Sequence, residues 1–246
     1  EDLGLIYFNE ENYAEALLYL RRISDLENRN DIVFKIGYIC FRLDSLNESV
    51  YYFSKLINKQ SKYTAPSQYY YAYIAYKKGL YNTSLLNFEL LLDDKQFKEI
   101  VPYYIAHIYS YEKKYRKLIE FMEPRINNVI SSRYTEINRL LADAYYKERN
   151  YLMAIKYYKN YLENSQATPL ARYFLGYSYY KVNDYKNAIT QLEKTHHFSD
   201  SLIQYSAYYL AASYLETGHK SYALQAFKKA ANFDYNFKIK EDAYFN

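Results

Sequence analysis

Glycine and proline, the residues typical of loops and tight turns, are rare in this chain. Its 246 residues include only 5 glycines and 4 prolines, while 50% of the side chains are hydrophobic. Long stretches must therefore run without the residues that interrupt helices, and we expect an all-α protein. The single cysteine, Cys40, excludes an intramolecular disulfide, and we expect it to be a small core residue rather than a nucleophile.

Several kinds of functional site are missing as well. The four histidines, His107, His196, His197 and His219, are too scattered to predict a metal site, and neither a glycine-rich phosphate loop nor a catalytic triad is visible. Lys and Arg total 32 against 28 Asp and Glu, and the two signs are interleaved, so nucleic acid is not an expected partner. No apolar run approaches the roughly 20 residues of a membrane span. We expect neither enzymatic activity nor a cofactor.

Tyrosine is what the chain has in excess. It carries 37 tyrosines and 13 phenylalanines but no tryptophan, which lies well outside ordinary globular usage. Such an excess needs a structural or a functional reason.

Small residues recur along the chain at intervals of 33, 35, 34, 36, 34 and 35 residues. We call them the markers: Gly4, Gly37, Ala72, Ala106, Ala142, Gly176 and Ala211. Twelve positions after each marker comes a second residue, small in all but one repeat: Ala16, Ser49, Ser84, Leu118, Ala154, Ala188 and Ala223. Sixteen positions after each marker comes a bulky side chain: Leu20, Phe53, Phe88, Met122, Tyr158, Leu192 and Phe227. Close approach at small residues, with a bulky neighbour filling the groove, predicts a hairpin of two helices in each repeat.

The segment from Tyr173 to Lys181, followed by Asn183 to Ala188, resembles the tetratricopeptide repeat (TPR) motif, and seven such copies cover nearly the whole chain. The family's Trp in the first helix and its Pro at the end of the second are absent from every copy. The resemblance implies a right-handed α-solenoid of about seven helical hairpins, with a partial eighth repeat at the C-terminus. The expected repeats of this single array are 1–28, 30–62, 65–96, 98–132, 134–167, 168–200 and 201–236, with the partial repeat at 237–246.

One proline is placed differently from the other three. Pro66, Pro102 and Pro169 fall near the starts of first helices, where a missing amide hydrogen costs nothing. Pro124 falls late in the second helix of the fourth repeat, so we predict a kink or an early end to that helix.

The resemblance also implies that first helices line one concave wall, through the positions three before, one after, and four or five after each marker. These positions are mostly tyrosine. The expected partner-binding residues are Tyr38, Tyr73 and Tyr177, directly after a marker; Tyr69, Tyr76, Tyr103, Tyr146, Tyr173, Tyr180 and Tyr208; and the cations Arg42, Lys77, Lys147 and Lys181. Tyrosine offers a large flat surface with a polar tip, which suits adaptable recognition. At the three-before and four-after positions tyrosine is also common in the family as helix packing alone, so both interpretations stay open there.

The expected function is a non-catalytic scaffold that binds a peptide or protein partner in a tyrosine-rich groove. An extended peptide can hydrogen-bond to the phenols and place its carboxylates against Lys77 and Lys181. Chaperone C-terminal tails are not expected, because the positions of the family's Lys and Asn carboxylate clamp are aromatic here.

Two alternatives stay open. One is a cell-wall or glycan-associated module, since tyrosine rings suit sugar faces. The other is a self-assembling array that forms a homo-oligomer through exposed terminal repeats. The chain begins and ends inside a repeat, so we expect a fragment of a larger bacterial protein. Resemblance to cell-envelope TPR proteins favours a periplasmic or envelope-associated location over a cytoplasmic one.

Overall fold

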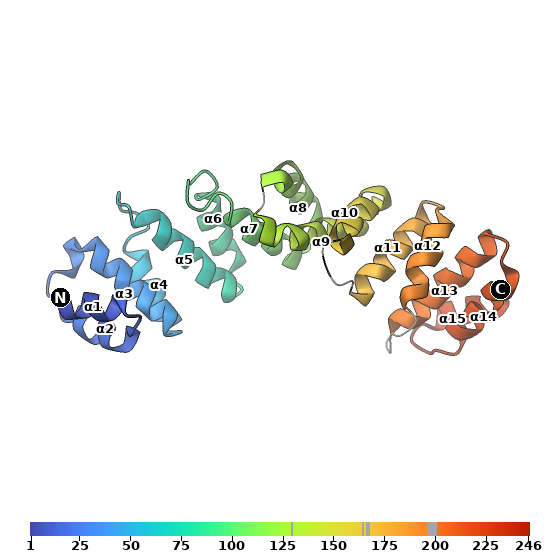
Figure 1. Ribbon diagram of the computed structural model, residues 1–246, viewed down its shortest axis with the longest axis horizontal. Coiled ribbons are helices and arrows are strands. Elements are labelled where there is room, and N and C mark those ends of the chain that lie inside the picture. The colour runs from blue at the N-terminus through green and yellow to red at the C-terminus, as the bar shows by residue number, and fades with distance from the viewer. Residues whose placement is uncertain (129, 164, 166–167, 196–200) are drawn as a thin grey trace. The chain divides into compact units, whose positions relative to one another are not determined.

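The computed structural model describes residues 1–128, 130–163, 165, 168–195 and 201–246, and these residues form fifteen α-helices and three short 3₁₀ helices (Figure 1). The predicted all-α class is confirmed. The odd-numbered helices up to α13 are the first helices of the repeats: α1 (Asp2–Asn9), α3 (Asn30–Arg42), α5 (Thr64–Lys77), α7 (Val101–Tyr111), α9 (Ser131–Lys147), α11 (Pro169–Lys181) and α13 (Ser201–Glu216). The second helices are α2 (Tyr13–Leu20), α4 (Leu46–Ser54), α6 (Tyr81–Glu89), α8 (Tyr115–Met122), α10 (Tyr151–Glu163), α12 (Tyr185–Leu192) and α14 (Lys220–Ala231). A last helix, α15 (Phe237–Phe245), follows.

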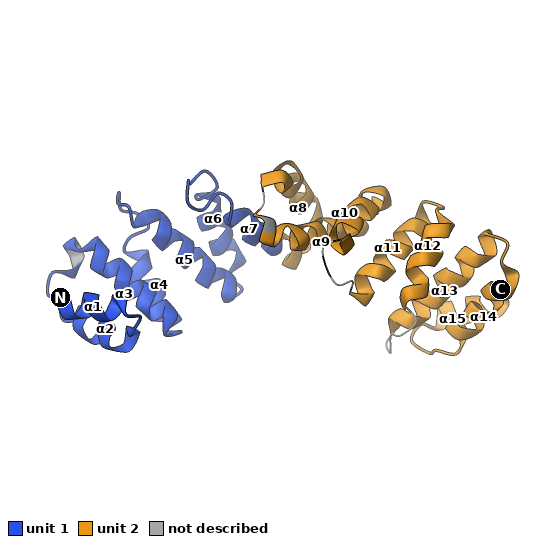
Figure 2. Ribbon diagram, in the orientation of Figure 1, with its two compact units in different colours: residues 1–108 blue, residues 109–246 orange. Residues whose placement is uncertain are grey.

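The chain divides into two compact units (Figure 2), and within them α1 packs with α2, α3 with α4, α5 with α6, α9 with α10, α11 with α12 and α13 with α14. Unit 1 comprises residues 1–108 and unit 2 comprises residues 109–246. Each unit is considered by itself below. No helix in the described residues is long and apolar enough to cross a membrane.

The markers lie where the two helices of a hairpin touch. A Cβ atom added to Gly37 would lie 3.0 Å from Cε1 of Phe53, and one added to Gly176 would lie 2.7 Å from Cγ of Leu192. Both contacts pair a marker with the bulky residue sixteen positions later, as predicted. The residue twelve positions later is also in contact, because the Ser49 hydroxyl donates a hydrogen bond of 2.9 Å to the carbonyl oxygen of Gly37. The predicted close approach is confirmed in these hairpins.

The turn inside each hairpin repeats one backbone conformation. In the described chain the residue seven positions after every marker has a positive φ: Glu11, Asp44, Gly79, Lys113, Arg149, Asn183 and Gly218. The next amide donates back to a carbonyl of the first helix, as from Asn150 N to Tyr145 O at 2.9 Å. A left-handed residue followed by an amide that donates to the carbonyl five residues earlier is the Schellman motif. It gives a hydrogen bond to a carbonyl at the helix end that would otherwise have none. Five of the seven residues are not glycine and carry the steric cost of that conformation.

The predicted effect of Pro124 is confirmed. Helix α8 ends at Met122, and a 3₁₀ helix, Glu123–Asn128, takes its place. A proline removes a backbone donor and collides with the preceding turn of an α-helix, so the α-helical pattern stops before it. At Pro169 the ring stands at the first position of α11, where the Thr168 hydroxyl accepts a hydrogen bond from the amide of Ala171 at 3.3 Å.

Cys40 is fully buried in α3, as expected for a core residue. Burial raises the pKa of its thiol to about 11, and the neighbouring Glu48 carboxylate adds to the effect. A thiol with this pKa carries almost no thiolate at neutral pH and is a poor nucleophile.

Candidate tyrosine surfaces and an aromatic pocket

Aromatic rings join successive first helices in unit 1. The ring of Tyr70 in α5 lies against two rings of α3, with its centroid 5.5 Å from that of Tyr38 and 5.1 Å from that of Phe41. Its plane is also nearly parallel to that of Phe53 in α4, at 5.3 Å. Three rings of one hairpin therefore form a socket for one ring of the next.

The same socket recurs one repeat later, and unit 2 has a version of it with two rings. Tyr104 lies 5.4 Å from both Tyr73 and Tyr76, and 5.2 Å from Phe88. In unit 2, the centroid of Tyr209 is 4.6 Å from that of Tyr177 and 5.2 Å from that of Tyr180. Helix α9 departs from the pattern, because Asp143 stands one position after its marker, and Phe174 meets only Tyr146 of that helix, at 4.3 Å.

The inserted rings are residues that the sequence prediction did not select. They stand two positions before a marker: Tyr70, Tyr104, Phe174 and Tyr209. The signal was present, since this position is aromatic in four copies. Tyr38, Tyr73 and Tyr177, which were expected to contact a partner, are half-buried and use part of their ring surface to hold the inserted rings.

The predicted cations lie beside these rings. Arg42, Lys77, Lys147 and Lys181 are exposed residues at the ends of their first helices. Lys77 Nζ is 6.0 Å from the ring centroid of Tyr73, and Lys181 Nζ is 6.0 Å from that of Tyr177. Lys147 Nζ lies 5.8 Å from Tyr146. A cation over a phenol ring is attracted by the ring quadrupole, and a cation in a last helical turn is also stabilised by the helix dipole.

The tyrosines three positions before a marker pack against aromatic rings of their own repeat or of the segment that follows it. Tyr69 stacks on Phe97 at 4.8 Å, Tyr103 lies 4.5 Å from the ring of His107, and Tyr208 lies 5.8 Å from Phe227. Tyr173 is only 7% exposed, and burial raises the pKa of its phenol well above the usual range. Burial of this kind leaves Tyr173 almost no surface to offer a partner.

In the fifth repeat Arg139 and Asp143 stand three before and one after the marker, where several other repeats have tyrosine, and they belong to an ion-pair network. Arg139 binds Glu136 and Asp143, each at 2.7 Å, and the Tyr158 hydroxyl donates to Asp143 at 2.5 Å. Burial raises the pKa of Asp143, opposed by the Tyr158 hydrogen bond and the Arg139 charge. These charged and polar side chains bind one another, so α9 presents an ion-pair network at positions where other first helices have tyrosine rings.

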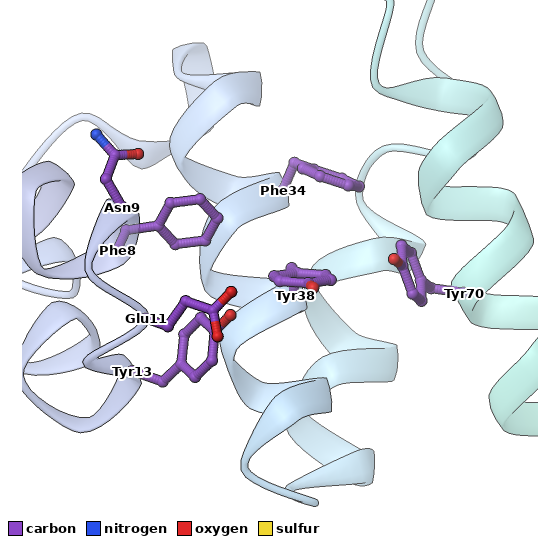
Figure 3. Close-up of a pocket in the computed structure, with 7 residues that line it drawn as sticks. All are labelled: Phe8, Asn9, Glu11, Tyr13, Phe34, Tyr38 and Tyr70. Carbon is purple, nitrogen blue, oxygen red and sulfur yellow. The ribbon is translucent and has the colours of Figure 1, made fainter.

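An open pocket of about 450 Å³ lies on the first-helix side of unit 1. Figure 3 shows its lining: Phe8, Asn9, Glu11 and Tyr13 on one side, Phe34 and Tyr70 on the other, and Tyr38 between them. The rings come from α1, α2, α3 and α5, and Glu11 is the left-handed residue of the first turn. Of these residues, only Tyr38 was among the expected partner-binding set.

Arg42 binds two of the phenols that line this pocket. Its Nη1 donates hydrogen bonds to the hydroxyls of Tyr13, at 2.9 Å, and Tyr38, at 3.0 Å. Its Nη2 lies 3.8 Å from Oε2 of Glu11, which is a long ion pair. Burial and the neighbouring phenol Tyr38 raise the pKa of Tyr13, so the Tyr13 hydroxyl keeps its proton at neutral pH.

The described residues contain no cluster of three His, Cys, Asp or Glu side chains that could hold a metal ion. His107 is buried against Tyr103, and the exposed His219 ring shares a hydrogen bond of 2.9 Å with Thr217. His196 and His197 lie outside the described residues.

The comparisons with known proteins agree with the helical-hairpin pattern. A family model, anaphase-promoting complex, cyclosome, subunit 3, matches residues 131–195. No curated protein sequence matches the chain. Among solved structures, the C-terminal part of a TPR repeat-containing protein from Cytophaga hutchinsonii is similar, with a TM-score of 0.65 at 19% identity, over 98% of this chain and 97% of that one.

Two further solved structures have the same architecture. YrrB, described as a TPR protein with an unusual peptide-binding site, has a TM-score of 0.66 at 15% identity, over 79% of this chain and 98% of its own. A TPR protein from Parabacteroides merdae has a TM-score of 0.52 at 14% identity, over 98% of this chain and 94% of its own. These likenesses show that the fold is the TPR fold.

Proposed function

We propose that this chain is a non-catalytic scaffold that binds a peptide or a flexible segment of another protein along its tyrosine-bearing first helices. One observation carries the proposal: half-exposed tyrosines with an exposed cation four residues later recur as Tyr38–Arg42, Tyr73–Lys77 and Tyr177–Lys181. Such a pair offers a flat apolar ring, a phenol hydroxyl and a positive charge at one place. A peptide backbone and an acidic side chain can use all three together.

The TPR fold supports this proposal, since solenoid repeats present extended surfaces suited to partner segments. YrrB, of like fold, has a peptide-binding site. The similar structures from Cytophaga hutchinsonii and Parabacteroides merdae support a bacterial source, and we keep the proposal that the chain belongs to a larger protein.

Crosslinking mass spectrometry in cells of the source organism tests the proposal. The test variant carries Lys77→Gln and Lys181→Gln, which remove exposed charges beside Tyr73 and Tyr177. The matched control carries Lys55→Gln, at the exposed lysine directly after α4, and Lys156→Gln, at an exposed lysine of α10. These lysines lie 4.3 Å from the Tyr51 ring and 5.0 Å from the Tyr157 ring. We expect a defined protein partner to be lost from the test variant and kept by the control. Equal partner lists for the two variants would refute a role for the first-helix surface.

Self-assembly is the alternative that specific residues favour. Large apolar side chains are exposed on α1, at Leu3 and Ile6, and on α15, at Phe237, Tyr244 and Phe245. Light scattering over a concentration series separates the two functions. Association that persists in the Lys77→Gln, Lys181→Gln variant would favour self-assembly, and a monomer at all concentrations would exclude it.

A further inference from the structure

We infer that the aromatic pocket of unit 1 binds a carboxylate group of a peptide, with an adjacent apolar side chain seated against its rings. This inference rests on the proposed function and gives the chemistry of one subsite. The pocket lining is the one already described, and Figure 3 shows the Glu11 carboxylate at its edge, close to Tyr13.

The hydrogen-bonding groups at the pocket are mainly donors. The hydroxyl oxygens of Tyr13 and Tyr38 both accept from Arg42. One phenol hydrogen can bridge the two hydroxyls, and the other is left to donate to a ligand. Arg42 keeps its Nε hydrogen, and Asn9 contributes an exposed amide. A carboxylate is the peptide group that accepts from several donors at once.

The charges around the pocket favour the same ligand. Lys35 Nζ lies 5.7 Å from the ring centroid of Phe8, and among the described residues it makes no ion pair. Asp31, one turn earlier in α3, is bound by Arg29 at 3.2 Å. The pKa of the Asp31 carboxyl is lowered by its hydrogen bond with Arg29 and, to a smaller extent, by the charge of Lys35. Within the described part of the chain, Arg42 has only the long contact with Glu11 as an ion pair. An incoming cation would meet ring faces already occupied by Lys35 and Arg42, whereas a carboxylate would meet the Arg42 guanidinium and the phenol hydroxyls beside it.

Glu11 occupies the place that a ligand carboxylate would compete for. Its side chain is 71% exposed, and its ion pair with Arg42 is long, at 3.8 Å. An exposed pair of this length contributes little to stability. Glu11 is therefore a weak internal competitor for Arg42, and a ligand carboxylate with better geometry would displace it.

The aromatic rings of the pocket would hold the apolar side chain that lies next to the ligand carboxylate. Phe8 and Phe34 are half-buried, and Phe34 stacks on Tyr63 at 5.4 Å, which fixes the back of the pocket. Tyr70 is held in its socket by Tyr38 and Phe41. Rings that are already fixed lose little entropy when a ligand arrives, so an apolar side chain next to the carboxylate gains contact area at low cost.

The experiment uses three capped, fluorescein-labelled peptides of repeated Gly-Phe-Glu, Gly-Phe-Gln and Gly-Phe-Lys, with fluorescence anisotropy as the readout. The Glu peptide is expected to bind the whole chain about tenfold more tightly than the Lys peptide at low salt, and the difference should shrink as salt rises. The reverse order would overturn the inference in favour of a cation site. Equal affinity of all three peptides would overturn it as well.

Glu11→Gln is the most informative substitution, because a carboxylate site and a cation site predict opposite changes in affinity. Removing the competing carboxylate should tighten binding of the Glu peptide by about threefold, whereas a cation site would be weakened by the same change. Arg42→Gln should weaken it, and Lys55→Gln, directly after α4, is the charge-matched control that should change nothing. Circular dichroism checks that each variant keeps its helix content. An unaltered affinity in both Glu11→Gln and Arg42→Gln would place the binding elsewhere and refute the subsite.

Failure of this inference can be told from failure of the proposed function. If no peptide binds but cellular crosslinking retrieves a partner through Lys77 and Lys181, the carboxylate subsite is wrong and the scaffold function stands. If neither is observed, both are wrong.

Discussion

The ring of Tyr209 meets the ring of Tyr177 edge-on, with centroids 4.6 Å apart and planes at 76°. The same relationship joins Tyr70 to Tyr38 at 70° and Tyr104 to Tyr73 at 73°. Edge-to-face contact is a favoured geometry for aromatic pairs and adds to the area that they bury. Part of the tyrosine excess therefore holds successive repeats together.

We expect the inserted rings to stabilise the fold and the cations beside them to contribute little to its stability. Tyr209→Ala is expected to lower the free energy of unfolding of unit 2 by about 2 to 4 kcal/mol, because a ring is removed from contact with two others. Lys181→Gln, at an exposed side chain beside the same socket, should change it by less than about 0.5 kcal/mol. Urea unfolding followed by circular dichroism measures both. Comparable losses in the two variants would contradict the socket.

The close approach at Gly176 predicts a steric cost for a single methyl group. Gly176→Ala gains about 1 kcal/mol of helix propensity but forces a Cβ atom to 2.7 Å from Leu192 Cγ. Overpacking costs about 1 to 3 kcal/mol, so we expect a net loss of about 1 kcal/mol. In a Leu192→Ala background the same substitution should cost nothing or stabilise the protein. A double-mutant cycle that finds the two changes additive would show that the helices do not touch there.

The left-handed turn residues predict opposite effects for two substitutions in unit 2. Arg149 has a φ of 60° and Gly218 a φ of 79°. Arg149→Gly should stabilise the protein by about 0.5 to 1 kcal/mol, since glycine adopts this conformation without a Cβ clash. Gly218→Ala should destabilise it by about 1 kcal/mol, although nothing lies within 4 Å of the added Cβ. Thermal unfolding of the two variants checks the signs, and two changes of the same sign would be inconsistent with the turn geometry.

Buried phenols predict a loss of stability at high pH. Burial, with the nearby Glu123 carboxylate, raises the pKa of Tyr157 to about 12, whereas an unfolded tyrosine ionises near 10. Between those values the folded state holds a proton that the unfolded state has lost, so stability is complete below about pH 10 and falls as the pH rises toward 12. Tyr157→Phe should make this fall shallower, and Tyr51→Phe, at a 55% exposed ring, should leave it unchanged. Urea unfolding at a series of pH values measures the slopes, and identical slopes in both variants would argue against a shifted Tyr157.

The sequence was most informative where one hairpin determines the geometry. Gly37 with Phe53, Gly176 with Leu192, and the helix end before Pro124 are contacts within a single repeat, so the spacing of residues along the chain is enough to predict them. The socket of Tyr70 was missed because it depends on how one hairpin sits on the next. The pocket was missed for a related reason, since Glu11 in a turn and Tyr13 in a second helix join a surface that was assigned to first helices alone.

A photo-crosslinking amino acid, placed one at a time along the chain in cells, tests binding on the first helices most directly. The positions are Lys77 and Lys181 on first helices, with Lys55 at the end of the second helix α4 and Lys156 on the second helix α10 as controls of equal chemistry. We predict that a single protein partner is crosslinked from positions 77 and 181 and not from 55 and 156. Crosslinking from the second-helix positions alone would contradict the proposed function and move the binding surface to the other face of the repeats.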